Sequence, residues 1–429
     1  MLVSFAGCAQ KEQGPVVTEI VMWHWMSDRE AAFDVLADKY EKETGIRVKF
    51  ELYAPTAAYT SKIRSAAQAS KLPDVYGVLL QQRDLAAFIN AGHVHDLTGY
   101  MERDNGQWKD LFYKSALALN SFPENNQYKV KPGIYGVPID MTNIQLVYNL
   151  DLLDAAGWDT SKLPTNWEEF MQLGEKLRQA KISGLVSGWG EAWMLSCFAD
   201  NYAYNIMGEK KIVKTINGQV PYTDPSWVQV LTLFQEIQAK GMFFPGSVTM
   251  VNKEAEQIFA NGRAAIAFNG SWCVNVYERM NPDLRYAVAL PPKVDVSRSM
   301  NIWGGATSFV VNEASNLKKE SIDFLRWLTL ADQQNYLAAE TNNIPANKSC
   351  MKLLKGPVAQ FADDMDKVVH PRLLPVEEYP LVTEVYNKGI QSIIIEENTP
   401  LEISERAEKA KKREIAKAER FKALREKNK

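Results

Sequence analysis

The strongest constraint on the fold is an alternation of strand and helix patterns in the N-terminal part of the chain. In order, it shows a strand pattern at 19–26, a helix pattern ending at Gly45, a strand pattern at 46–52, a helix pattern at 56–70 and a strand pattern at 73–79. This alternation predicts an α/β fold with a mostly parallel sheet flanked by helices. Ligands of such sheets bind at the carboxyl ends of the strands, so residues directly after each strand carry most weight.

Local signals further along continue the pattern. The segment 165–168 has the spacing of a capping box and predicts a helix that runs to Gln179. Asp224 followed by Pro225 predicts another helix start, and Gly241 predicts its end. Further strands are expected at 144–148, 264–268, 286–290 and 307–311.

A chain of 429 residues is too long for one compact core, because single cores stop growing near about 250 to 300 residues. We therefore expect two lobes. No internal repeat or long linker separates them, so ordinary strands and short loops should form a hinge. The predicted segments are a tether at 1–15, an N-terminal lobe at 16–138 plus about 305–365, a C-terminal lobe at 139–304 plus about 366–403, and a charged C-terminal helix at 404–429.

Composition and charge exclude several classes of protein. Hydrophobic residues make up 46% and charged residues 24%, ordinary values for a globular protein. The net charge is −3, but the segment from Ser404 onward carries eleven Lys and Arg against five Glu, so the remainder is near −9. A mildly acidic body argues against nucleic acid as a partner. No window approaches the roughly 18 consecutive apolar residues that a membrane-spanning helix requires.

The four cysteines form no CxxC pair. Cys197, Cys273 and Cys350 are expected to be buried apolar residues, with a bridge between two of them left open. Cys8 differs, because Phe5-Ala6-Gly7-Cys8 ends a short apolar stretch and a polar tether follows. This segment resembles the lipobox of bacterial lipoproteins, in which the cysteine is acylated; the alternative is a chance cysteine in a ragged N-terminus. Few residues precede Cys8, so we expect the natural chain to begin earlier.

A set of short motifs covers the chain from Glu19 to about Thr399. In order, they are Trp23-His24-Trp25, Glu43 to Val48, Leu72 to Val75, Tyr135 to Pro138, Leu146 to Leu153, Ala156-Gly157, Pro164 to Phe170, Phe259 to Ile266 and Asn269 to Trp272. Their order resembles that of the extracellular solute-binding proteins of bacterial ABC importers, of the sugar-binding, maltose-binding-like kind.

That resemblance implies two α/β lobes joined by a hinge, which close over a sugar and deliver it to a membrane permease driven by a cytoplasmic ATPase. The chain has no GxxxxGK[ST] motif, as a binding subunit requires. We expect a monomer without a cofactor, outside the cytoplasm, held to the membrane only by a lipid on Cys8, and without enzymatic activity.

A sugar presents apolar C–H faces and a rim of hydroxyls, so its receptor needs aromatic side chains and planar polar groups. The candidates lie after predicted strands, in loops or at the crossing between lobes. They are Trp23, Trp25, Asp28, Gln81, Gln82, Arg83, Asp140, Trp189, Trp193, Asn269, Trp272, Trp303, Gly304, Gly305, Asn343 and Arg372. The competing interpretation is structural: a tryptophan packs in the core, Asp28 caps a helix, and the two glycines permit a bend.

Two other functions stay open. A glycoside hydrolase also needs aromatic side chains, and adds two carboxylates about 5 to 9.5 Å apart, for which Asp28, Asp140 and Glu191 are candidates. A surface carbohydrate-binding lipoprotein without a transport role would need no hinge closure. Metal binding by His93 and His95 is not expected, because no third ligand lies near them in the sequence.

Overall fold

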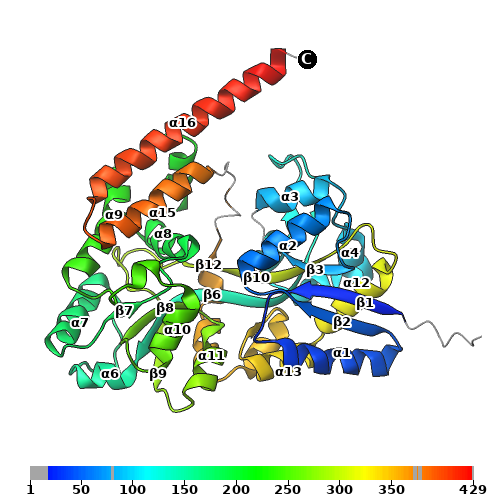
Figure 1. The fold of residues 1–429 in the computed structure, drawn as a ribbon, viewed down its shortest axis with the longest axis horizontal. Coiled ribbons are helices and arrows are strands. Elements are labelled where there is room, and N and C mark those ends of the chain that lie inside the picture. The colour runs from blue at the N-terminus through cyan, green and yellow to red at the C-terminus, as the bar shows by residue number, and fades with distance from the viewer. Residues whose placement is uncertain (1–17, 79–81, 371–373, 375–378, 428–429) are drawn as a thin grey trace, which may run out of the picture.

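A computed structural model describes residues 18–78, 82–370, 374 and 379–427 (Figure 1). Its main sheet is mixed. The strands along it are, in spatial order, β2 (Arg47–Leu52), β1 (Glu19–His24), β3 (Val75–Val78), β10 (Ile302–Val311), β6 (Val137–Asn149), β8 (Ile266–Gly270) and β7 (Leu185–Val186). In addition, β9 (Tyr286–Ala289) and β11 (Ile344–Pro345) pair with β6, and β12 (Val368–Val369) pairs with β10. A separate ribbon joins β4 (Ser121–Phe122) to β5 (Gly133–Ile134).

Helices surround the sheet in two groups, one on either side of its middle (Figure 1). The group around β1 to β3 consists of α1 (Glu30–Thr44), α2 (Thr56–Gln68), α3 (Gln82–Asn90), α4 (Thr98–Gly106), α5 (Lys114–Ala118), α12 (Lys318–Leu328) and α13 (Ala331–Thr341). The group around β7 to β9 consists of α6 (Leu150–Ala155), α7 (Trp167–Gln179), α8 (Ala192–Ile216), α9 (Pro225–Ala239), α10 (Asn252–Ala260), α11 (Cys273–Met280), α14 (Gly356–Ala362), α15 (Pro380–Ile394) and α16 (Pro400–Lys427).

The strand β6 belongs to both groups. Its first part pairs antiparallel with β10, and its second part pairs antiparallel with β8 and β9. The sequence predicted only 144–148 as strand, because nearly all of β6 is buried and its apolar pattern does not alternate. The strand β10 also begins earlier than predicted, so Gly304 and Gly305 lie within it. A Cβ on Gly304 would lie 2.4 Å from the carbonyl oxygen of Thr142, so glycine is required where the two strands pass each other.

The predicted α/β class is confirmed, and the strand directions refine it. Parallel pairs join β1 to β2 and β3, β7 to β8, and β10 to β12, whereas every pair made by β6 is antiparallel. Each side of the molecule therefore keeps a parallel unit, and the crossing strands run against it.

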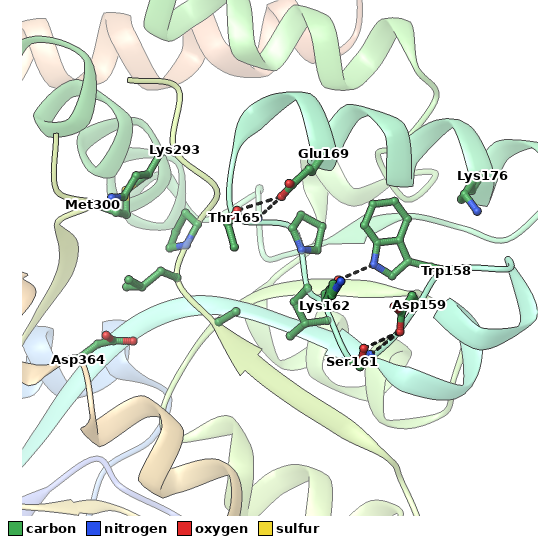
Figure 2. Close-up of a pocket in the computed structure, with 15 residues that line it drawn as sticks. Trp158, Asp159, Ser161, Lys162, Thr165, Glu169, Lys176, Lys293, Met300 and Asp364 are labelled. Atoms are coloured by element: carbon green, nitrogen blue, oxygen red, sulfur yellow. Dashed lines mark hydrogen bonds between the residues drawn. The ribbon is translucent and has the colours of Figure 1, made fainter. Parts of the chain in front are cut away.

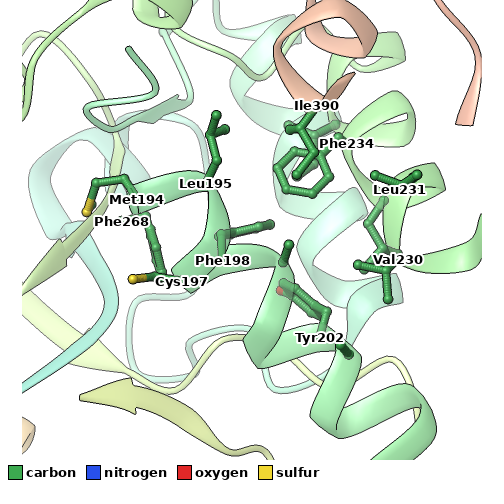
Figure 3. Close-up of a cluster of buried hydrophobic side chains, with 14 of the residues drawn as sticks. Met194, Leu195, Cys197, Phe198, Tyr202, Val230, Leu231, Phe234, Phe268 and Ile390 are labelled. Carbon is green, nitrogen blue, oxygen red and sulfur yellow. The ribbon is translucent and has the colours of Figure 1, made fainter. Parts of the chain in front are cut away.

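Separate apolar cores support the two sides. One joins α1, β1 and α12, with Phe33, Phe309 and Leu325 fully buried. The other lies between β8, α8, α9 and α15, where Phe198 contacts Phe268 and Phe234 (Figure 3). Cys197 lies in this second core, and Cys197, Cys273 and Cys350 are all buried and free, which removes the bridge left open by the sequence.

Helix boundaries follow the predicted signals closely. The N-cap of α7 is Asn166, whose side chain accepts a hydrogen bond from the Glu169 amide, so the cap lies one residue later than predicted. Asp224 caps α9 as expected. The C-terminal helix α16 packs on α9 and α15 through the buried side chains of Ile403, Ala407 and Ala410, and its far end projects from the body (Figure 1).

Candidate functional site

The candidates near the N-terminus gather at one edge of the sheet. Because β1 and β3 are parallel neighbours, with Trp23 opposite Tyr76, the segments that follow them leave from the same edge. Trp25 and Asp28 follow β1, and Gln82 opens α3 after β3. Gln81, Arg372 and Cys8 lie outside the described residues.

A second edge carries the candidates of the other side. The parallel strands β7 and β8 run toward the same edge: β7 ends at Val186, opposite Ala267, and β8 continues to Gly270. Trp193 lies in the first turn of α8, and Trp272 lies directly before α11. Their ring centroids are 6.0 Å apart with an angle of 53° between the planes. The sequence separates these residues widely, and the shared strand edge brings them into contact.

The two edges face each other across the middle of β6. The strand β3 ends opposite Ser308 of β10, and Ser308 pairs with Pro138 of β6. The strand β8 ends at Gly270, which pairs with Ile144 of β6. Both strands point toward the stretch of β6 between those two levels. At a rise of about 3.3 Å per residue, the levels are about 20 Å apart. Half-buried Thr142 of β6 and Thr307 of β10 lie in this interval.

Trp272 is held in one orientation by its surroundings. Its Nε1 donates a 3.0 Å hydrogen bond to Oε1 of Glu256, and Asn252 Nδ2 donates to the same oxygen at 2.8 Å. The other carboxylate oxygen of Glu256 lies 3.0 Å from Lys253 Nζ. A Cβ on Gly270 would lie 2.1 Å from two carbons of the Trp272 ring, so the indole lies directly over that backbone.

Trp193 and Glu191 lie at the start of α8. Trp193 is 40% exposed, the most exposed tryptophan among the candidates that the structure describes. Glu191 precedes it and accepts a 3.0 Å hydrogen bond from the Asn252 amide, which joins the start of α8 to the start of α10. The carboxylate of Glu191 therefore has a structural partner.

On the opposite edge, Trp25 is half-buried and contacts two aromatic rings. Its centroid is 5.1 Å from that of Tyr59 and 6.3 Å from that of Phe309. Asp28 is half-buried and lies 3.8 Å from Arg29 Nε, and its predicted helix-capping alternative is not realised, because Arg29 is the N-cap residue of α1. Arg83 is exposed and lies 3.6 Å from Asp84. These side chains can donate and accept hydrogen bonds at the edge.

Asp140 and Asn343 form a buried cluster with Arg29. Arg29 Nη1 lies 2.5 Å from Asp140 Oδ2, and its Nη2 donates a 2.7 Å hydrogen bond to Asn343 Oδ1. All three side chains are nearly inaccessible. Burial raises the pKa of Asp140, and the Arg29 guanidinium opposes that rise. This cluster joins the start of α1 to β6 and to the residue before β11. Asp140 and Asn343 therefore have partners within the chain, and their contact with a ligand stays a prediction.

Three further candidates are also core residues. Trp189 is fully buried and stacks on Phe268 with centroids 5.9 Å apart, because the loop after β7 turns inward over β8. Trp23 is 8% exposed and packs edge-on against Tyr53. Asn269 is buried, and its side chain bonds the Gly270 amide and the Tyr277 hydroxyl. The core interpretation therefore holds for these three.

Trp303 marks the start of β10 at the level of the second edge. Its ring lies 4.3 Å from that of His370, and its amide donates a 2.7 Å hydrogen bond to Asn201. Asp200 of α8 lies beside it. Burial raises the pKa of Asp200 to about 7, and a hydrogen bond with the Trp303 side chain acts in the opposite direction. Gly305 lies next to His370, because a Cβ placed on this glycine would be 3.1 Å from Cδ2 of the imidazole ring.

A hollow of about 1090 Å³ lies elsewhere, beside the loop before α7 (Figure 2). Apolar residues such as Trp158, Pro164 and Pro291 line it, together with Lys162 and Lys293. None of the predicted site residues lines this hollow. Its carboxylates already have partners within the chain, as when Glu169 accepts hydrogen bonds from Thr165.

Within the described part of the chain, no group of three or more His, Cys, Asp or Glu side chains could hold a metal ion. Nor does any described helix have the length and apolar character needed to cross a membrane.

Comparison with known proteins identifies the family. Residues 35–365 match the family model described as bacterial extracellular solute-binding protein. The chain belongs to this family. Relatives of this solute-binding protein include a putative binding protein of Brucella abortus (strain 2308), 21% identical over 86% of each chain. Another is the maltooligosaccharide ABC transporter solute-binding lipoprotein of Streptococcus pneumoniae, 21% identical over 75% of this chain and 70% of the relative.

Solved structures share the fold. A maltose-bound MalE3 of T. maritima superposes with a TM-score of 0.75, at 21% identity, over 92% of this chain and 99% of the other. The predicted two-lobe fold and the predicted family are therefore confirmed. Family membership places the solute-binding protein outside the cytoplasm and among binding proteins rather than enzymes.

Sequence reasoning missed several residues that contact the candidates. Arg29, Asn252, Glu256 and Asp200 lie inside helices or at their starts, where a polar or charged residue normally faces water. The only signal was indirect. Glu256 lies three residues before the Phe259 motif, and Arg29 directly follows the candidate Asp28.

Proposed function

We propose that this protein is a carbohydrate receptor that captures a sugar or oligosaccharide between its two strand edges and delivers it to an ABC importer permease. The observation that carries the proposal is the pair of edges, each bearing aromatic and polar side chains, that face each other over the middle of β6. The S. pneumoniae relative is named for maltooligosaccharide transport and the T. maritima structure holds maltose, which supports a sugar as the ligand.

The ligand contacts in this proposal come from both edges. Trp25, Asp28, Gln82 and Arg83 serve one edge, and Gln81 joins them by its position in the sequence. The other edge offers Trp193 and Trp272 as stacking surfaces, with Trp303 and Gly305 in the crossing strand. Arg372 joins them by its position in the sequence shortly after β12. About 20 Å between the edges accommodates more than one sugar ring, which favours an oligosaccharide.

Closure of two lobes is the mechanism we propose. The proposed N-terminal lobe is 16–138 plus about 305–365, and the proposed C-terminal lobe is 139–304 plus about 366–403. Because α14 packs on β9, the second boundary lies before α14 in this proposal rather than near 365. A ligand that touches both edges stabilises the closed form by its differential affinity for the two forms. The permease then recognises the closed surface. The apolar clusters around Phe33 and Phe198 lie on different sides and support two units. A third cluster, which includes Ala116, Val147 and Phe259, packs along β6 between them.

The lipid anchor remains part of the proposal. Acylation of Cys8 would tether a monomer to the membrane, and the S. pneumoniae relative is named as a lipoprotein. Incorporation of labelled palmitate that Cys8→Ala abolishes is the expected result. Equal labelling of the variant would remove the anchor from the proposal.

The main test is a titration of intrinsic tryptophan fluorescence with mono- and oligosaccharides, followed by analysis of the recovered sugar. A saturable change with one sugar class, the sugar recovered intact, and a smaller radius of gyration in solution scattering at saturation are expected. Recovery of a cleaved sugar would instead indicate a glycoside hydrolase. Silence across the panel would favour a non-sugar solute or a surface lipoprotein without transport.

A further inference from the structure

The hydrogen bond between Trp272 and Glu256 has a specific consequence for the proposed sugar site. Glu256 is fully buried, and its two oxygens are occupied by Trp272, Asn252 and Lys253. Hydrogen bonds to an ionised acceptor are roughly twice as strong as neutral ones. The acceptor is itself immobile, because it is held at both oxygens, so the indole Nε1 is fixed in position.

The two faces of the Trp272 ring are unequal. An ideal Cβ on Gly270 would lie 2.1 Å from Cη2 and Cζ3 and 2.5 Å from Cε3, so the backbone covers one face. Trp272 is half-buried, so part of its side chain is exposed to solvent. The ring centroids of Trp193 and Trp272 are 6.0 Å apart and the planes are at 53°, which leaves no room for a sugar ring between the two. The pair therefore forms an open wedge rather than a sandwich.

We propose that Glu256 is a positioning residue that locks Trp272 as one wall of an aromatic corner, and that this corner receives a single pyranose ring of the ligand. The inference rests on the proposed sugar-binding function. A pyranose stacks its apolar C–H face on the free face of Trp272, and Trp193 contacts the edge of the same ring. A locked indole binds without losing rotamer freedom, so the affinity depends on the hydrogen bond to Glu256.

A double-mutant cycle tests the inference by calorimetric titration with the sugar that binds the intact protein. Glu256→Ala is expected to weaken binding about tenfold or more, and Glu256→Gln, which keeps an acceptor oxygen, about threefold or less. In a Trp272→Phe background, which has no indole N–H, Glu256→Ala is expected to change the affinity less than twofold. Such coupling would not arise from a purely structural role of Glu256.

The chain offers a matched control. Trp327 Nε1 donates a 2.7 Å hydrogen bond to Glu43 Oε2 on the outer side of α1, the same type of bond in a different place. Glu43→Ala should leave the sugar affinity unchanged. Near-UV circular dichroism of the ligand-free proteins gives a second readout, in which Glu256→Ala should lose an indole signal that Glu256→Gln retains.

The outcomes separate the two hypotheses. If the sugar binds the intact protein but Glu256→Ala binds equally well, or loses affinity equally in both backgrounds, the positioning role is wrong and the receptor proposal stands. If no sugar binds the intact protein, both fall. A ligand series adds a check on the single ring: W272A should cost the same factor for every oligosaccharide length, and a cost that grows with length would overturn the one-ring corner.

Discussion

Arg29 Nη1 lies 2.5 Å from Asp140 Oδ2, and this contact ties the first helix to the strand that both sides of the molecule share. Neither side chain reaches solvent appreciably. Such a pair holds two elements in register, because each charge is costly to bury without the other. The relationship gives Asp140, which lies between the two strand edges, a charged partner within the chain.

Removal of Arg29 should therefore destabilise the fold. Arg29→Met leaves the Asp140 carboxylate buried without its cation, and we expect the free energy of unfolding to fall by about 3 to 5 kcal/mol. Urea unfolding measures it. Arg83→Met, at an exposed arginine, should change stability by less than about 0.5 kcal/mol. The second change Asp140→Asn in the Arg29→Met protein should recover part of the loss, and failure to do so would argue against the charge as its cause.

Affinity for sugar should depend on one group of tryptophans and not on another. Trp193→Ala and Trp272→Ala each remove a stacking surface, and we expect affinity losses of about 1 to 3 kcal/mol. Trp158→Ala alters the hollow beside α7 and should leave the affinity unchanged. Calorimetry is the appropriate measurement, since each change also alters the fluorescence. A loss in Trp158→Ala alone would move the ligand site to that hollow.

Stability should fall with rising pH because of Asp200. Its folded pKa of about 7 lies above the ordinary aspartate pKa of 3.8, so its contribution to the free energy of unfolding is fully present below pH 3.8 and is lost as the pH rises toward 7. Asp200→Asn removes this titration. Relative to Asp200→Asn, the wild type should lose on the order of 3 kcal/mol of unfolding free energy between pH 4 and pH 8. A difference independent of pH would contradict the assignment.

The crossing of β6 and β10 should not tolerate a larger residue. Gly304→Ala places a methyl group 2.4 Å from a carbonyl oxygen of the neighbouring strand, and backbone cannot move aside as a side chain can. We expect a loss of about 1 to 3 kcal/mol in denaturant unfolding. Gly99→Ala is the comparison, because its Cβ meets no atom within 4 Å. Equal stability of the two variants would show that the strands can separate at this point.

The sequence predicted the α/β class, most helix starts and the family, because these depend on local patterns. Asp224 before Pro225 is sufficient to begin α9, whatever surrounds it. The extent of β6 could not be read in this way. A strand buried on both faces has no alternation, and its length depends on partners such as Gly304 and Gly270 that lie far away in the chain.

The sequence selected candidate residues by their position after strands, and their contact with a ligand stays a prediction. Two of them, Trp193 and Trp272, lie far apart in the sequence, and their ring centroids are 6.0 Å apart in the structure. The prediction also selected Trp189, which follows the same strand as Trp193 and lies in the core. Position after a strand does not tell which way a loop turns, and that direction decides whether a side chain faces a ligand or the interior.

The way the C-terminal segments return to both cores determines when the chain can fold. The core around Phe33 is incomplete without Phe309 and Leu325, and the other core needs Ile403 and Ala407. At about 5 to 20 residues per second, synthesis takes on the order of twenty seconds or more to supply these partners. Until then neither half can close its interior. A protein that works outside the cytoplasm thus has an extended period in which it is still unfolded enough to be exported.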